Sequence, residues 1–211
     1  MKAGNITTLF LDLGGVLLTN GWDHHARKRA ILHFHLDEEE LEERHHLTFD
    51  TYESGKLTLD EYLDTLVFYE KRNFTKDDFK SFMFEQSYAH DDTIAYFKKL
   101  KNDYGLSMVA LNNEGRELNE FRIQKFKLNR LFDAFISSCY VHLRKPDLDI
   151  FRVACDISQA TPAQVIYMDD RNMFVESARS LGIQAYHFQG LDAARNYMIS
   201  IGFHTDMEEK K

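Results

Sequence analysis

Thr7-Thr8-Leu9-Phe10-Leu11-Asp12-Leu13-Gly14-Gly15-Val16-Leu17 is the stretch of sequence that decides the fold. Its apolar, β-forming residues are typical of a buried strand, which we expect to end in the carboxylate of Asp12. The two glycines that follow allow a tight turn with open backbone amides. Open α/β sheets bind their ligands at the carboxyl end of such a strand, although a solvated turn residue would give the same local pattern.

The composition is typical of a soluble globular protein, because 44% of the 211 residues are hydrophobic and 28% are charged. The formal net charge of −8 and the absence of a Lys/Arg-rich block argue against nucleic acid as a partner. An anionic substrate would therefore need local positive charge from a metal, a lysine or backbone amides.

The cysteines and the N-terminal residues give expectations about the cellular location. Cys139 and Cys155 are too few and wrongly spaced for a zinc site or a disulfide framework, and two reduced thiols fit a cytoplasmic protein. The first apolar run is short and is broken by Asp12, so we expect neither a signal peptide nor a membrane span.

After residue 90 the sequence alternates between helical and strand patterns. Apolar runs typical of buried strands lie at residues 106–111, 134–138, 165–168 and 184–188. Together with the run at 7–11, this alternation predicts an α/β fold with a parallel, doubly wound sheet.

Residues 19–90 have a different character, with many charges and aromatics and no proline. Asp37 is a candidate N-cap, Thr58 and Glu61 have the spacing of a capping box, and Gly55 can end a helix in the left-handed conformation. We expect helices at residues 23–36, 37–54, 58–69 and 75–87. The chain is therefore predicted to form a sheet domain of residues 1–18 and 91–211 with a small helical domain, 19–90, inserted after the first strand.

Polar side chains follow four of the predicted strands: Asp12, Asn112-Asn113, Lys145 and Asp169-Asp170. Because the carboxyl ends of parallel strands meet at one edge of a sheet, these side chains can converge. Three carboxylates and one ammonium leave an excess of negative charge, which is unfavourable unless a cation neutralises it. Mg²⁺ is the usual hard cation with oxygen ligands where phosphate is also bound.

This series resembles the four motifs of the haloacid dehalogenase-like (HAD) hydrolase superfamily, and the resemblance covers nearly the whole chain. The matching segments are Asp12-Leu-Gly-Gly-Val-Leu, Leu111-Asn112-Asn113, Lys145-Pro146-Asp147 and Asp169-Asp170, the last within the segment 165–183, which is the most specific part of the resemblance. The resemblance implies a Rossmann-like core with an inserted helical-bundle cap domain of the first type. It also implies Mg²⁺-dependent phosphoryl transfer through an aspartyl-phosphate, the commonest activity of the family, on a small phosphorylated substrate.

The resemblance also implies roles for individual residues. Asp12 would be the nucleophile and a metal ligand, together with the backbone carbonyl of Gly14 and the carboxylate of Asp170. Lys145 would balance the charge of the nucleophile and bind the phosphate. Asp169 would orient Lys145 or a metal-bound water. These roles agree with the need of phosphoryl transfer for positioning and charge stabilisation.

Binding of the phosphate oxygens would fall to backbone amides and to one side chain. The resemblance assigns the amides of Leu13, Gly14 and Asn113 to this task, helped by the side chain of Asn112. Family members usually carry Ser or Thr where this chain has Asn112, whose amide can still donate a hydrogen bond.

Gly14 is the second departure from the family, whose phosphatases usually have a general acid/base Asp two residues after the nucleophile. General acid–base help is worth roughly 10²–10⁴ in rate. We therefore expect phosphates with good leaving groups, such as anomeric sugar, acyl or aryl phosphates, and the same glycine resembles sugar-1-phosphate phosphatases. Two alternatives stay open: a metal-independent dehalogenase that uses Asp12 and Lys145, and a binding or regulatory protein with a weakened site.

Residues of the helical insert would select the substrate. Lys56 lies in a loop that dips toward the nucleophile in related caps, and could contact a substrate oxygen. Trp22 could close the cleft or simply pack in the insert. His24 is a candidate proton donor, although a surface histidine fits its position better. Arg144 and Arg171 flank the motifs and are either ordinary surface residues or sources of positive potential.

Overall fold

The computed structural model describes residues 5–205, which contain a five-stranded parallel sheet. The strands are β1 (Thr8–Leu11), β2 (Ser107–Asn112), β3 (Ala134–Ser137), β4 (Val165–Asp169) and β5 (Gln184–His187). Their order, β3-β2-β1-β4-β5, places β1 in the centre. From β1 the chain continues to β2 and β3 on one side and then to β4 and β5 on the other. Such a change of side opens a crevice at the carboxyl end of the central strand. The predicted α/β class and doubly wound parallel sheet are confirmed.

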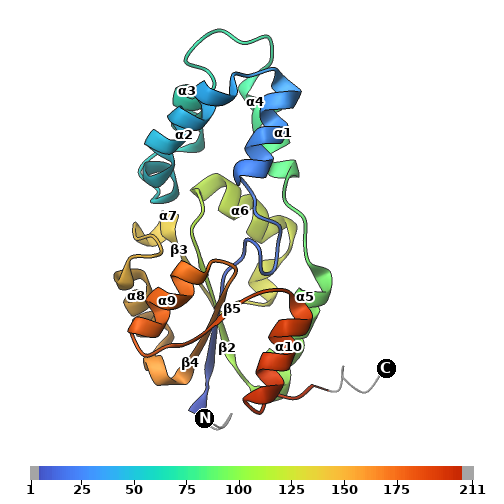
Figure 1. Cartoon of the computed structure of the whole chain (residues 1–211), viewed down its shortest axis with the longest axis vertical. Helices are drawn as coiled ribbons and strands as arrows, with labels where there is room; N and C mark the ends of the chain where they lie inside the picture. The colour runs from blue at the N-terminus through green and yellow to red at the C-terminus, as the bar shows by residue number, and fades with distance from the viewer. Residues whose placement is uncertain (1–4, 206–211) are drawn as a thin grey trace.

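Two layers of helices cover the sheet (Figure 1). Leu9 and Leu11 of β1 point into a core shared with α5 (Asp91–Tyr104) and α10 (Leu191–Ser200). Phe10 points to the opposite face, where it packs with residues of α8 (Leu148–Ser158) and α9 (Asn172–Ser180). Successive strand residues alternate between faces, so an apolar run without polar interruptions serves both cores.

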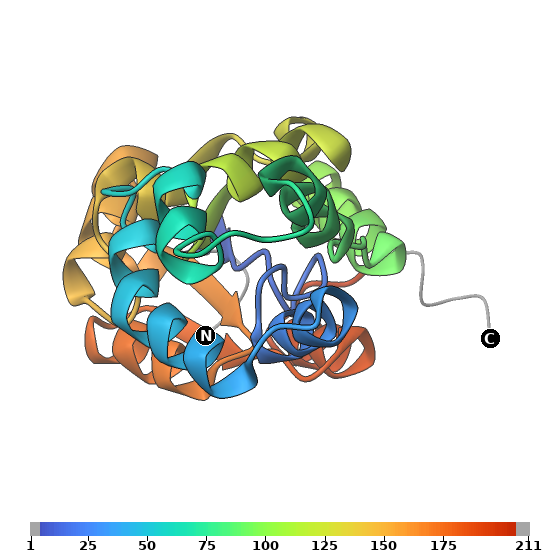
Figure 2. The same cartoon turned by 90° about the horizontal axis from the view of Figure 1, so that it is seen from above.

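Four further helices lie beyond the carboxyl ends of the strands and cover this edge of the sheet when seen from above (Figures 1 and 2). We call them the cap helices: α1 (His24–Phe34), α2 (Glu38–Glu53), α3 (Leu59–Leu66) and α4 (Lys76–Glu85). They share an apolar core, which also takes in Leu118 of α6 (Arg116–Lys125). Through α6, the cap helices are packed directly on the part of the molecule that holds the sheet.

The predicted helix starts in this region are confirmed. The side chain of Asp37 accepts a hydrogen bond from the backbone N–H of Glu40, and Thr58 and Glu61 form a reciprocal capping box. Such caps satisfy backbone donors that have no partner inside the helix. Gly55 has φ +69° just after α2, in the left-handed region that glycine tolerates.

The single-turn helices of the structure were not predicted from the sequence. The segment predicted as a strand to residue 138 ends one residue earlier, and a single-turn helix α7 (Ser138–Val141) follows. Two 3₁₀ turns, η2 (Leu128–Arg130) and η3 (Pro162–Gln164), also lie in predicted loops. One turn is too short to give a periodic pattern. Within residues 5–205, no helix has the length and apolar character needed to span a membrane.

Candidate active site

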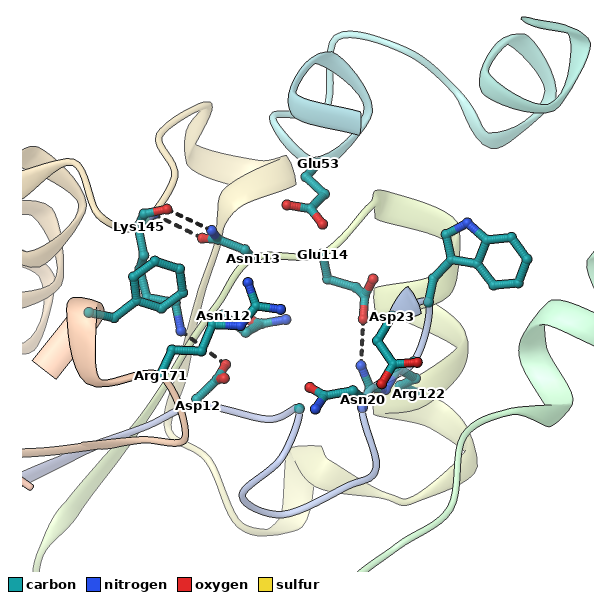
Figure 3. A pocket seen from close by; sticks show the side chains of 14 residues that line it. Asp12, Asn20, Asp23, Glu53, Asn112, Asn113, Glu114, Arg122, Lys145 and Arg171 are labelled. Atoms are coloured by element: carbon teal, nitrogen blue, oxygen red, sulfur yellow. Dashed lines mark hydrogen bonds and ion pairs between the residues drawn. The ribbon is translucent and has the colours of Figure 1, made fainter. Parts of the chain in front are cut away.

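The carboxyl ends of β1, β2 and β4 bring the predicted site residues together. Asp12 follows β1 directly, and its backbone N–H donates to the carbonyl of Met168 in β4 at 3.0 Å. Asn112 is the last residue of β2 and Asp169 is the last residue of β4. The sheet itself therefore fixes the positions of these side chains, and Figure 3 shows Asp12 with Lys145 and Asn112 beside it.

Lys145 is the buried cation of the site, with 1% of its surface exposed. Its Nζ lies 3.0 Å from Oδ1 of Asp12, 2.6 Å from Oδ2 of Asp169 and 2.9 Å from the carbonyl oxygen of Leu111. These three acceptors use all three N–H groups of an ammonium. Burial lowers the pKa of Lys145, but Asp12 and Asp169 outweigh this effect and leave it above its ordinary value.

Asn113 fixes the backbone of Lys145. Its side-chain Nδ2 donates to the carbonyl of Lys145, and its Oδ1 accepts from the Lys145 N–H, each at 2.9 Å. The residue expected to supply a phosphate-binding amide thus has a second task, because its side chain holds the lysine in place.

Asp169 is completely buried and forms an ion pair with Lys145, the contact that an orienting role toward this lysine requires. Its Oδ2 accepts from Lys145 and from the hydroxyl of Tyr167, while its Oδ1 accepts from the backbone N–H of Arg171 at 2.8 Å. Because both oxygens already have donors, Asp169 is a poor candidate for a metal ligand.

The side chain of Asn112, whose expected help in phosphate binding stays a prediction, is bonded mainly to other residues. Its Oδ1 accepts from Ser137 at 2.8 Å and its Nδ2 donates to Asn119 at 3.0 Å, so it belongs to a buried trio with these residues. Asn119 closes the trio with a bond to Ser137 at 3.1 Å. Asn112 borders the cavity, but most of its hydrogen-bonding capacity serves to tie β2 to β3 and α6.

A cluster of carboxylates at this edge is suited to a divalent cation. Asp12, Asp169 and Asp170 each offer an oxygen, and these atoms lie within 4.8 Å of one another. Oδ1 of Asp170 is buried and has no hydrogen-bond partner among the described residues. Since an unpaired buried carboxylate oxygen is costly, a hard cation bound by Asp12 and Asp170 fits this donor set.

The charges of the cluster are reflected in its pKa values. Burial, opposed by Lys145 and assisted by Asp169 and Asp170, raises the pKa of Asp12 to about 7. Burial and the neighbouring Asp169 also raise the pKa of Asp170 above its ordinary value. A bound cation would favour the ionised form of both carboxyl groups.

A polar cavity of about 70 Å³ lies above Asp12, between the sheet edge and the cap helices (Figure 3). Gly14 lines its floor, whereas Leu13 is buried; their amide and carbonyl roles stay predictions. Its other lining residues are Asn20, Gly21, Trp22, Asp23, Glu53, Asn112, Asn113, Glu114, Arg122, Lys145, Arg171 and Phe174.

Glu53, and not Lys56, is the residue that the α2–α3 region contributes to the cavity. Lys56 is exposed and does not line it. The physical reason is the contact of Gly55, where an added Cβ would lie 2.3 Å from the carbonyl oxygen of Cys139. This close approach turns the last residue of α2 inward and the residue after Gly55 outward.

Hydrogen bonds hold this end of α2 on the core. The hydroxyl of Ser138 donates to the carbonyl of Glu53 at 2.6 Å, and Nδ1 of His142 lies 2.7 Å from the carbonyl of Ser54. Arg144 donates to Oε2 of Glu53 at 2.9 and 2.6 Å and also pairs with Asp50. Arg144 thus acts on the site through Glu53, whereas Arg171 lines the cavity itself.

Contacts decide two predictions for the start of the helical insert, at Trp22 and His24. Trp22 lines the cavity, and its Nε1 donates to the hydroxyl of Tyr62 at 3.0 Å. His24 does not line it; its Nδ1 lies 3.5 Å from Glu42, and its side chain is 56% exposed. His24 is therefore not placed to donate a proton here.

Several residues of the cavity were missed by the sequence analysis. Glu114 and Arg122 form a buried ion pair, and burial raises the pKa of Glu114 to about 7. Asn20 lies in the segment between β1 and α1 and donates to Asp170. Glu114 directly follows a motif and could have been suspected, whereas Asn20 and Arg122 reach the site only through the tertiary fold.

Comparisons with known proteins identify relatives by sequence and by fold. The drimenol cyclase DrtB of Aspergillus calidoustus is 32% identical over 207 residues, covering 93% of this chain but 36% of that protein. The chain therefore spans about a third of the length of this relative. A bifunctional epoxide hydrolase of Sus scrofa is 33% identical over 63 residues, which cover 30% of this chain and 11% of that protein.

Solved structures share the fold over most of their length. A HAD family enzyme of Bacteroides thetaiotaomicron superposes with a TM-score of 0.78 at 20% identity, covering 92% of this chain and 98% of that one. An L-2-haloacid dehalogenase of Xanthobacter autotrophicus, with chloropropionic acid covalently bound, gives a TM-score of 0.61 at 15% identity, covering 95% and 85%. The model of the haloacid dehalogenase-like hydrolases matches residues 17–188, and with Asp12 and Lys145 paired at the central strand, the chain belongs to this family of hydrolases.

Proposed function

We propose that this hydrolase is a Mg²⁺-dependent phosphatase that transfers the phosphoryl group of a small metabolite to Asp12. The observation that carries the proposal is the buried Oδ1 of Asp170 beside Asp12, because this oxygen has no hydrogen-bond partner within residues 5–205 and so marks a place for a cation. The Bacteroides enzyme has also been solved in complex with magnesium and inorganic phosphate, with a TM-score of 0.72 at 20% identity.

The residues of the site support a two-step reaction. A carboxylate oxygen of Asp12 attacks phosphorus, the bond to the leaving oxygen breaks, and the leaving oxygen takes up a proton. Water then attacks phosphorus of the aspartyl-phosphate, which releases inorganic phosphate and restores the carboxylate. Lys145, 3.0 Å from Asp12, stabilises the negative charge of the nucleophile and of the phosphate. Mg²⁺, when bound by Asp12 and Asp170, supplies further charge neutralisation to both reactants.

The upper side of the cavity supports a leaving group with hydroxyls, such as a sugar. Glu53 and Glu114 line this side, each with its Oε2 engaged by an arginine, Arg144 or Arg122. Carboxylates in this position accept hydrogen bonds from hydroxyl groups, whereas they repel a second phosphate. The cavity therefore has the ammonium of Lys145 beside Asp12 and carboxylates on the opposite side, an arrangement that would orient a phosphate ester.

Gly14 carries no side chain that could protonate the leaving group. We therefore propose substrates whose leaving oxygen needs little protonation, with anomeric sugar phosphates first among them. Such substrates would be met in the cytoplasm.

The test is a panel of phosphate esters assayed for released phosphate in Mg²⁺ and in EDTA. The panel contains hexose 1-phosphate, acetyl phosphate, aryl phosphate, hexose 6-phosphate and glycerol 3-phosphate. We expect Mg²⁺-dependent turnover that is faster on the first three. Equal turnover of the alkyl esters would refute the leaving-group argument. Absence of turnover on the whole panel would favour a binding or regulatory role.

A dehalogenase is the second candidate, because the Asp12–Lys145 pair alone would serve that chemistry and the Xanthobacter relative performs it on a similar fold. Chloride release from 2-chloropropionate is the measurement that separates the two. Release that persists in EDTA would establish the dehalogenase, since its reaction requires no metal.

A further inference from the structure

The two glycines after the nucleophile are each covered by the side chain of another residue. A Cβ added to Gly14 would lie 2.7 Å from Oδ1 of Asn20, and one added to Gly15, where φ is +71°, would lie 2.1 Å from Oδ2 of Asp170. Real Cβ atoms do not approach other atoms this closely. The side chain of Asn20 therefore packs against the backbone of Gly14, and the side chain of Asp170 packs against the backbone of Gly15.

These two side chains also contact each other. Nδ2 of Asn20 lies 3.4 Å from Oδ2 of Asp170 and donates to it. The hydrogen bond engages one oxygen of Asp170, while the buried Oδ1 has no partner in the described part of the chain. Asn20 thus fixes which carboxylate oxygen is left for a ligand. Asn20 lines the same cavity as Asp12, as Figure 3 shows.

The segment that carries Asn20 is itself held in place from the core. Arg122, which is 2% exposed, donates to the carbonyl of Thr19 at 2.6 Å. A Cβ added to Gly21 would lie 3.0 Å from the guanidinium of Arg122. The residues on both sides of Asn20 are therefore packed against a buried arginine, which limits where its side chain can lie.

We propose that Asn20 is the positioning residue of the metal site: it takes the space above Gly14 and holds the carboxylate of Asp170 in the orientation that binds Mg²⁺. This inference rests on the proposed Mg²⁺ dependence. Residue 14 must then be a glycine, because Asn20 occupies the space of a side chain there. A side chain at residue 14 would displace Asn20 and thereby disturb the metal site.

The test is a double-mutant cycle on the affinity for Mg²⁺, measured by isothermal titration calorimetry without substrate. Groups that orient metal ligands typically change affinity by about 10–100-fold when they are removed. We expect Asn20→Ala to weaken Mg²⁺ binding by about tenfold and Gly14→Ala to do the same. In the Asn20→Ala background, Gly14→Ala should add less than about twofold, because the side chain that it displaces is already gone.

The control is Asn196→Ala, which removes the same side chain from an exposed position on α10 and should leave the affinity unchanged. Thermal unfolding in EDTA identifies a variant that fails to fold, and Asn20→Ser then replaces Asn20→Ala.

The outcomes separate the two proposals. If the parent binds Mg²⁺ and Asn20→Ala binds it equally well, or if the two substitutions weaken binding independently, Asn20 is not the positioning residue although the proposed phosphatase survives. If the parent protein does not bind Mg²⁺ at all, both proposals are wrong.

Discussion

Lys145→Met tests the charge balance on which the site depends. The substitution keeps an unbranched apolar chain but removes the ammonium that lies 3.0 Å from Asp12 and 2.6 Å from Asp169. Breaking a buried ion pair from one side costs about 3–5 kcal/mol, because the other charge stays buried without a partner. Since a domain of this size has a total stability of roughly 5–15 kcal/mol, the variant should still fold but unfold in less urea.

The pH dependence gives this prediction a specific signature. A carboxyl group whose pKa is raised in the folded protein binds a proton that the unfolded chain lacks, so stability falls as the pH rises toward the folded pKa. In the parent this loss ends near pH 7, the pKa of Asp12. Without Lys145 the pKa of Asp12 rises further, so the stability of the variant continues to fall above pH 7, by about 1.4 kcal/mol per pH unit. The difference in stability between parent and variant should therefore widen from pH 7 to pH 8.5.

Urea unfolding followed by circular dichroism at pH 6, 7 and 8.5, with EDTA present, measures this difference. Lys101→Met is the matched control, because Lys101 forms a partly exposed ion pair with Asp133 at 2.6 Å. Its loss should cost about 1 kcal/mol or less at every pH. A Lys145→Met variant that loses less than about 1 kcal/mol at pH 7, or that differs from the parent equally at pH 6 and 8.5, would refute the reasoning.

Three further substitutions test other parts of the molecule. Asp12→Asn should lower phosphate release by roughly 10⁴-fold or more, because it removes the nucleophile, and a variant as fast as the parent would exclude the aspartyl-phosphate. Arg144→Met should raise KM about fivefold with little change in kcat. The reason is that the partly exposed ion pair between Arg144 and Glu53, worth about 1 kcal/mol or less, holds Glu53 at the cavity. An unchanged KM would contradict this. Burial lowers the pKa of His45 to about 3. The hydroxyl of Tyr62 accepts a hydrogen bond from Trp22 and donates one to Nδ1 of the neutral His45 ring. As the pH falls below about 6.5, the free energy of unfolding of the parent should therefore decrease by up to about 1.4 kcal/mol per pH unit relative to that of His45→Gln. If urea unfolding shows the same pH dependence for both proteins, His45 is not buried in its neutral form.

The sheet and its functional edge could be predicted because their signals are local. Each strand is a short apolar run, and Asp12, Asn112 and Asp169 stand at the ends of such runs, so the strand pattern alone places them together. The same applies to the helix starts at Asp37 and Thr58, where a capping side chain acts within three residues of its own position.

What could not be predicted depends on contacts between distant segments. Asn112 bonds to Ser137 because residues 112 and 137 are paired across β2 and β3, a register that the sequence of either strand does not specify. The inward position of Glu53 follows from the close approach of Gly55 to Cys139, which are 84 residues apart in the numbering. A loop that dips toward a site can be expected from sequence, but the residue that enters the site is decided by such a contact.

Arg122 shows how one buried residue joins the two sides of the site. Its guanidinium pairs with Glu114 on the upper side of the cavity and donates to the carbonyl of Thr19, next to Asn20 on the lower side. These bonds pair its two terminal nitrogens, whereas its buried Nε has no partner among the described residues. Movement of the segment after β1 would break one of these bonds, and movement of Glu114 would break the other. The position of Asn20 over Gly14 and the position of Glu114 at the cavity are therefore coupled through the side chain of Arg122.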